Sequence, residues 1–224
     1  MAALKAFVST GLALLMASAA LAQSAPAPTT APPADRGLVY LVDAERAQAI
    51  AAANAALNGL ATIEARFFQI GWDGASSQGK VVMARPGKVR FAYDAPTKLL
   101  IVADGATVAI EDGALKTVDR APLRSTPLWF VLKKEIDLGR DATITEVRRE
   151  DGLLFITVQD RSGEAQGALT LVFDGAPLAL TQWVVRDPQG YVTRVALSDV
   201  TALDKVDPRL FVVNDENDPT DRRR

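Results

Sequence analysis

Turn signals recur along most of this chain and restrict it to a fold built from short strands. After Thr62, short apolar runs are separated by sequences that favour tight turns, namely Asp73–Gly74, Pro86–Gly87, Asp94–Pro96, Asp104–Gly105, Asp112–Gly113, Asp151–Gly152, Asp174–Gly175 and Asp187–Gly190. Such signals at intervals of about 8–12 residues are typical of an antiparallel meander. Apolar side chains alternate with others within the runs, as at Val89, Phe91 and Tyr93, which makes one sheet face strongly apolar. The sequence therefore predicts a mainly β protein with helices, in the α+β class.

One helix is predicted before the strands begin. Asp43 can cap its N-terminus, and Gly59 lies near its expected end at about Leu60. Apolar residues at helical spacing form one stripe along it: Ile50, Ala53, Leu57 and Leu60.

A second helix is predicted in the middle of the strands. Thr126 is a good N-cap, Pro127 suits the first helical position, and the apolar run Leu128–Leu132 follows. A helix that is apolar all round needs cover on more than one side. It is either a buried core helix, which composition alone favours, or a lid over an apolar cavity.

The two ends of the chain are expected to lie outside the folded domain. Lys5, the apolar run that follows it and the small residues of Ala20-Leu21-Ala22 predict a signal peptide over residues 1–22, rather than a retained membrane anchor. A Pro/Ala-rich linker over residues 23–37 is expected next. A single domain is then predicted over residues 38–213, with a polar tail over residues 214–224.

Composition excludes several classes of function. The chain has 25 basic and 27 acidic residues, a net charge of −2, so no basic surplus is present to hold nucleic acid. Cys and His are absent, which removes thiol nucleophiles, His-based triads and Cys/His zinc sites. The stretch Gly74–Lys80 matches the start of a phosphate-binding loop, but Val81 replaces the required hydroxyl residue, and we interpret the stretch as a flexible hairpin turn. No enzyme activity, cofactor or metal is therefore expected.

Four segments, in order, resemble those of a known family: Phe67–Gln69, Gly79–Tyr93, Leu100–Gly105 and Thr126–Leu128. After a signal peptide and one helix, they are similar to the periplasmic outer-membrane lipoprotein carriers of the LolA type. The resemblance spans nearly all of the chain after the linker. It implies an unclosed antiparallel β half-barrel covered by a helical lid, with an apolar hollow for the acyl chains of a lipoprotein.

The same resemblance implies a setting and a set of partners. The chain would be a soluble periplasmic monomer that receives acylated lipoproteins from an inner-membrane ABC exporter of the LolCDE type. It would pass them to an outer-membrane acceptor where one is present. The alternative is a half-barrel regulator that senses lipid or lipoprotein, although such regulators usually carry a second domain.

Arg85 is the leading candidate site residue. The Pro86–Gly87 turn places it at a strand end, with the parity of the apolar Val81 and Met83. A guanidinium among apolar groups is costly unless its donors are paired, and a lone strand-end Arg ordinarily extends into water instead. The resemblance implies that it points inward and latches the lid through helix carbonyls. The acyl-chain cavity and lid are expected to use Val81, Met83, Val89, Phe91, Leu128, Trp129 and Leu132.

Overall fold

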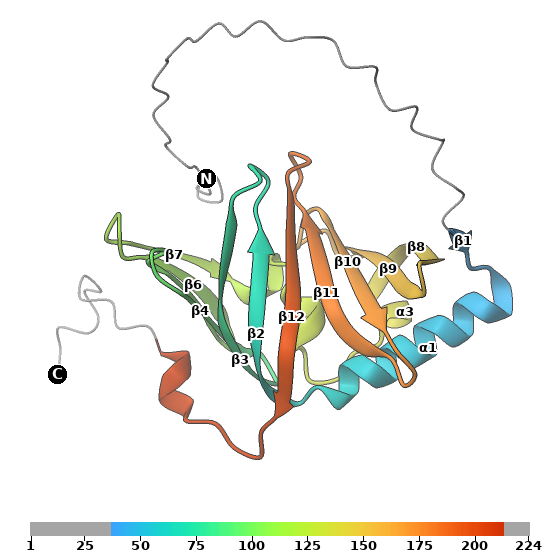
Figure 1. The fold of residues 1–224 in the computed structure, drawn as a ribbon, viewed down its shortest axis with the longest axis horizontal. Helices are drawn as coiled ribbons and strands as arrows, with labels where there is room; N and C mark the ends of the chain where they lie inside the picture. Colours follow the sequence, from blue (N-terminus) through green and yellow to red (C-terminus); the bar gives the residue numbers. More distant parts are fainter. Residues whose placement is uncertain (1–36, 213–224) are drawn as a thin grey trace, which may run out of the picture.

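The computed structural model describes residues 37–212, and its core is one antiparallel sheet of twelve strands (Figure 1). The strands are β1 (Val39–Tyr40), β2 (Thr62–Ile70), β3 (Ser76–Ala84), β4 (Lys88–Tyr93), β5 (Leu99–Asp104), β6 (Thr107–Asp112), β7 (Thr117–Pro122), β8 (Ala142–Glu150), β9 (Leu153–Asp160), β10 (Ala168–Asp174), β11 (Ala179–Arg186) and β12 (Val192–Ala202). Their order across the sheet is β1-β8-β9-β10-β11-β12-β2-β3-β4-β5-β6-β7. Because β1 and β7 lie at opposite edges and do not pair, the sheet is unclosed. The predicted α+β class and half-barrel are confirmed.

Helical segments lie on the face toward which the sheet curls. They are α1 (Asp43–Gly59), η1 (Leu123–Ser125), α2 (Trp129–Leu132) and α3 (Leu138–Asp141), with a further 3-10 turn, η2 (Pro208–Phe211), after the last strand. In Figure 1, β2 and β12 stand at the front while the segments between β7 and β8 lie behind the sheet. One large apolar core joins α1, α2 and the concave sheet face, and η2 covers a small cluster on the other face, around Val82 and Val102.

The helix α1 has the predicted length but not the predicted cap. It begins at Asp43, whose φ is +47°, and the preceding Val42 makes no side-chain capping bond. Asp43 and Glu45 lie in the first turn, where their negative charges interact favourably with the positive end of the helix dipole. The buried stripe consists of Ala49, Ala53 and Leu57, with Ile50 and Leu60 only partly buried.

The helix α2 is a single turn, shorter than predicted. The Thr126 hydroxyl donates to the Leu123 carbonyl at 2.8 Å instead of capping the helix, so the predicted N-cap is wrong. The Thr126 carbonyl nevertheless accepts the Trp129 N–H at 3.1 Å, which starts the turn. Lys133, with φ −64° and ψ 158°, then leaves the helical conformation and ends it.

Most of the stretch Gly74–Lys80, predicted to be a flexible hairpin turn, is a strand. Only residues near Asp73 and Gly74 turn; Ser76 to Lys80 belong to β3. A Cβ at Gly79 would lie 2.1 Å from the Ala92 carbonyl oxygen and 2.8 Å from the Phe67 ring. The missing side chain therefore lets the Phe67 ring lie over its cross-strand partner.

Candidate functional site

A small apolar cavity of about 30 Å³ lies between the concave sheet face and the helices. Its walls are side chains from the end of α1 and the residue after it, from α2 and the residue before it, and from five strands: Leu57, Leu60, Ile63, Val81, Met83, Val89, Phe91, Leu128, Val131, Leu132, Leu180, Trp183 and Leu197. Every lining residue is hydrophobic. A volume of this size holds one or two water molecules at most, so the side chains nearly fill the space.

Strand register brings the predicted sheet residues together. Val81 pairs with Phe91 and Met83 with Val89 across β3 and β4, and on the other side Met83 pairs with Ile63 of β2. Pairs directly opposite each other point to the same face of the sheet. The prediction that these four β3 and β4 residues share one apolar surface agrees with this register.

Six of the seven predicted cavity residues line the cavity, and Trp129 does not. The Trp129 ring instead lies beneath two cations, with the Arg124 guanidinium 4.7 Å and the Lys133 ammonium 5.7 Å from its centre. On a one-turn helix, Leu128, Val131 and Leu132 face the cavity, and Trp129 therefore faces another side.

Sequence reasoning missed the contributions of α1 and of β11 and β12. Leu57 and Leu60 come from the C-terminal end of α1, and Leu180, Trp183 and Leu197 come from strands late in the chain. The alternation in β11 and β12 could have marked them as inward-facing. Their place beside β2 depends on long-range pairing, because β12 is hydrogen-bonded to β2.

Arg85 lies in the β3–β4 turn and binds the C-terminal end of α1. Its Nε donates to the Leu60 carbonyl at 2.7 Å, and its Nη2 donates to the Asn58 carbonyl at 2.8 Å. Helix C-termini leave carbonyls without intrahelical donors and carry a partial negative charge, and α1 has no basic residue in its last turn. Arg85 therefore supplies both the donors and the cation that this helix end lacks.

The remaining guanidinium nitrogen of Arg85 is less well placed. Nη1 is buried and has no hydrogen-bond partner among residues 37–212. Burial lowers the pKa of the Arg85 side chain from its ordinary value, although an arginine stays charged at neutral pH. An unpaired buried donor destabilises the arrangement that contains it, so the Arg85 contact is weaker than one in which all three nitrogens are bonded.

The turn that carries Arg85 also contacts α2. The Gly87 N–H donates to the Leu132 carbonyl at 2.7 Å. Gly87 has a φ of +77°, and a Cβ there would lie 2.6 Å from the Cα of Gly105. One three-residue turn thus joins the end of α1 to the end of α2.

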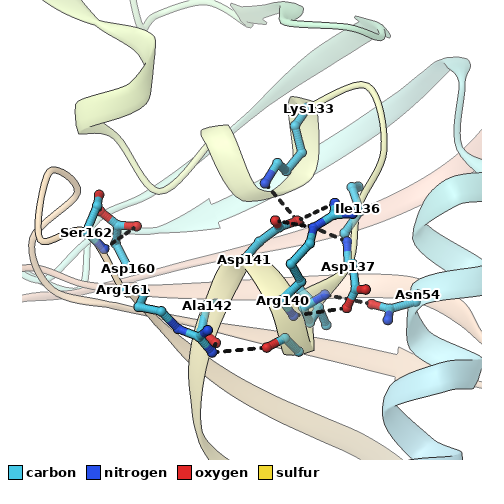
Figure 2. A network of polar contacts seen from close by, with 12 residues as sticks. Asn54, Lys133, Ile136, Asp137, Arg140, Asp141, Ala142, Asp160, Arg161 and Ser162 are labelled. Carbon is cyan, nitrogen blue, oxygen red and sulfur yellow. Dashed lines mark hydrogen bonds and ion pairs between the residues drawn. The ribbon is translucent and has the colours of Figure 1, made fainter.

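A polar network fixes the connection between α2 and α3 (Figure 2). Asp141 is its centre: Oδ2 lies 2.7 Å from the Lys133 ammonium and accepts the Asp137 N–H at 3.1 Å, while Oδ1 accepts Arg140 Nε at 2.9 Å. Its side chain is only 13% exposed. Burial opposes its ionisation, but the bonds from Arg140, Lys133 and Asp137 outweigh burial and lower its pKa to about 2.

An open groove of about 620 Å³ lies beside the apolar cavity. It is lined by the β2–β3 turn, the β4–β5 loop and the β6–β7 hairpin, and its mixed walls include Gln69, Tyr93, Lys98, Ile110 and Thr117. The Phe67 ring contacts one lining residue of each space, with its centre 5.3 Å from the Phe91 ring and 4.9 Å from the Tyr93 ring. Burial raises the pKa of Tyr93 to about 12, and its hydroxyl donates to Gln69 Oε1 at 2.9 Å.

The part of the chain that the structure describes contains neither a metal-binding cluster nor a helix that could span a membrane. Within residues 37–212, no group of three or more acidic, Cys or His side chains is placed to hold a metal ion. Over the same residues, no helix is both long enough and apolar enough to cross a membrane.

The fold and the cavity define the class: an unclosed antiparallel half-barrel with helices over an apolar concave face. The family model described as outer membrane lipoprotein carrier protein LolA matches residues 58–214 of this chain. The chain therefore belongs to the LolA family of outer-membrane lipoprotein carriers. This is a family of transport proteins, so the chain is a carrier and not an enzyme. The match also favours a carrier over the half-barrel regulator considered above.

Two relatives of known sequence agree with the family assignment. The chain is 29% identical over 165 residues to the outer-membrane lipoprotein carrier protein of Methylococcus capsulatus, covering 69% of this chain and 78% of that one. It is 32% identical over 108 residues to the carrier of Coxiella burnetii, covering 44% of this chain and about half (51%) of the relative. Among solved structures, a LolA superfamily protein from Nitrosomonas europaea is 9% identical with a TM-score of 0.45, covering 75% of this chain and 97% of that one.

Proposed function

We propose that this protein carries acylated lipoproteins across the periplasm from the inner to the outer membrane, with the acyl chains held in the apolar cavity. The observation that carries the proposal is the cavity itself, whose thirteen lining residues are all hydrophobic. Burying a methylene group is worth about 0.8 kcal/mol, so exposing one long acyl chain to water costs on the order of 10 kcal/mol. A multiply acylated protein needs such a surface to cross an aqueous compartment.

A cavity of about 30 Å³ is much too small for a long acyl chain, so the proposed role requires it to widen. Acyl chains can enter only if α2 and the end of α1 move away from the sheet, because the cavity walls include Leu57, Leu60, Leu128, Val131 and Leu132 from these segments. Arg85 acts as the latch of the closed state through its two bonds to α1. Movement of a lid between two states would allow both uptake and release.

The proposed partners follow from this role. An inner-membrane ABC exporter of the LolCDE type would supply the lipoprotein, and an outer-membrane acceptor would take it where one exists. The open groove next to the cavity offers the polypeptide part of the cargo a more polar surface than the acyl chains require.

Two single substitutions at the start of α2, compared with each other, test the role of the cavity. Leu128→Asp places a charge at the cavity wall and should abolish co-purification of lipoproteins with the carrier from periplasm, measured by mass spectrometry. Trp129→Asp is the matched control because the Trp129 ring does not line the cavity, and it should reduce lipoprotein recovery far less.

Folding is checked for both variants by circular dichroism and thermal unfolding. Equal recovery of lipoproteins with folded Leu128→Asp and with the unmodified chain would contradict the proposal.

A further inference from the structure

The lid segment, defined here as residues 128–138, reaches α1 through asparagine side chains rather than through Arg85. Within residues 37–212, the Arg85 side chain donates to two backbone carbonyls at the C-terminal end of α1, those of Asn58 and Leu60, and to none in the lid segment. Two asparagines four residues apart, Asn54 and Asn58, project from the same face of α1. Each of them bonds to the backbone of the connection between α2 and α3.

Asn58 makes the more complete contact of the two. Its Nδ2 donates to the Ile136 carbonyl at 2.8 Å, and its Oδ1 accepts the Ile136 N–H at 3.0 Å. Ile136 is buried, with 2% of its surface exposed, and lies outside the sheet. Buried backbone groups need partners, and the Asn58 carboxamide supplies both of them, as a neighbouring strand would. Asn54 supplies one bond, from the Leu138 N–H to its Oδ1 at 3.0 Å.

Asn58 also receives the Arg85 contact. Its backbone carbonyl accepts Arg85 Nη2 at 2.8 Å, while its side chain holds Ile136. The same residue is therefore bonded to the β3–β4 turn through its backbone and to the lid segment through its side chain.

We infer that Asn58 is a positioning residue that couples the Arg85 latch to the lid segment, so that both are released in one opening movement. The inference rests on the proposed function. When the lid segment lifts, water can bond the Ile136 N–H and carbonyl, so the Asn58 bonds favour only the closed state. Removing the side chain leaves these groups unpaired in the closed state and shifts the population toward the open one.

The test compares variants of the full carrier in their affinity for a fluorescent long-chain fatty acid. Asn58→Ala should bind the probe more tightly, on the order of five-fold, because less free energy opposes opening. The control variant Asn54→Ala removes one bond instead of two and should change affinity less. Arg85→Leu alone should raise the affinity for the fatty acid. Added to Asn58→Ala, it should raise that affinity little further.

Amide hydrogen exchange supplies a readout that needs no ligand. Asn58→Ala should speed exchange at Ile136 while leaving Ile156 and Leu171, which are fully buried in the sheet, unchanged. Equal acceleration at all three would mean general destabilisation and would overturn the coupling.

Unchanged or weaker fatty-acid binding by folded Asn58→Ala would also overturn the coupling. If Asn58→Ala does not fold, Asn58→Leu takes its place; it has a similar volume, can make neither of the two bonds to Ile136, and carries the same predictions. If the unmodified chain binds no fatty acid, the proposed function fails, and the exchange measurement still decides whether Asn58 holds the lid segment.

Discussion

At the scale of single residues, two side-chain nitrogens of Arg85 form hydrogen bonds and the third forms none within residues 37–212. Two of its nitrogens bond the end of α1, and its buried Nη1 has no partner within residues 37–212. Hydrogen bonds from a charged donor are stronger than neutral ones, whereas the unpaired buried nitrogen costs free energy. Under the proposed function, this balance gives a contact that holds the end of α1 over the cavity and that an incoming ligand can break.

Replacing Arg85 should separate cargo loading from cargo release. Arg85→Leu removes two charge-assisted bonds and should weaken the closed state by about 1–3 kcal/mol, allowing for partial exposure to water. Bound lipoprotein should accumulate on the purified variant, and its transfer to outer membranes should slow because less free energy drives closure. Both quantities are measured by quantitative blotting of the cargo after incubation with membranes.

Arg90→Leu is the control for this variant. Arg90 lies on the neighbouring strand but bonds the Leu210 carbonyl at 3.2 Å, away from the cavity. It should load and transfer lipoprotein normally. Normal loading and transfer by folded Arg85→Leu would rule out the latch.

At the scale of elements, the connection from α2 to α3 is held by polar contacts with α1 and by polar contacts within the connection itself. Asn54 and Asn58 bond it from α1, and Asp141 bonds it internally through Lys133 and Asp137. A one-turn helix has little intrinsic stability in water. The single turn of α2 therefore depends on these flanking contacts and on packing of its apolar residues against the sheet.

The Asp141 network should make the free energy of unfolding decrease as the pH becomes acidic. The folded-state pKa of Asp141, about 2, lies below its ordinary value of 3.8, so its contribution is complete above pH 5 and is lost as the pH falls toward 2. Its size is about 2 kcal/mol. Asp141→Asn should be less stable than the unmodified chain by this amount at pH 7, with the difference shrinking toward pH 2 in urea unfolding experiments.

Asp204→Asn, in the exposed loop after β12, is the control and should follow the unmodified chain at every pH. A stability difference for Asp141→Asn that stays constant from pH 7 to pH 2 would show that the ion pair does not contribute as described.

At the scale of the whole molecule, the twelve-stranded sheet does not close on itself, and this leaves a concave face for the helices and cavity. The predicted signal peptide, linker and polar tail fall mainly on residues 1–36 and 213–224, which lie outside the described residues. The division of the chain into these parts stays a proposal, as does export to the periplasm.

Export can be tested directly. We expect cleavage after Ala22, so the protein recovered from the periplasmic fraction should begin at Gln23 in N-terminal sequencing. The control is a chain with Ala20 and Ala22 replaced by bulky residues, which should remain uncleaved. A membrane-bound species that begins at Met1 in the unmodified chain would contradict both the cleavage and the proposed location.

Local patterns in the sequence determined the strands, the turns and α1. Alternation at Val89, Phe91 and Tyr93 and the turn at Pro86–Gly87 predicted β4 and its start correctly, because side-chain parity and turn geometry depend on neighbouring residues. The same parity placed Val81 and Met83 on the cavity face.

Only the tertiary structure decided which helical residues face the cavity and what holds them there. Trp129 and Leu132 are equally apolar in the sequence, yet one lies under Arg124 and Lys133 and the other lines the cavity. The two bonds between Asn58 and Ile136 span 78 positions along the chain. No local pattern encodes such contacts, because they form only when β12 pairs with β2 and the sheet curls to bring α1 and α2 to one concave face.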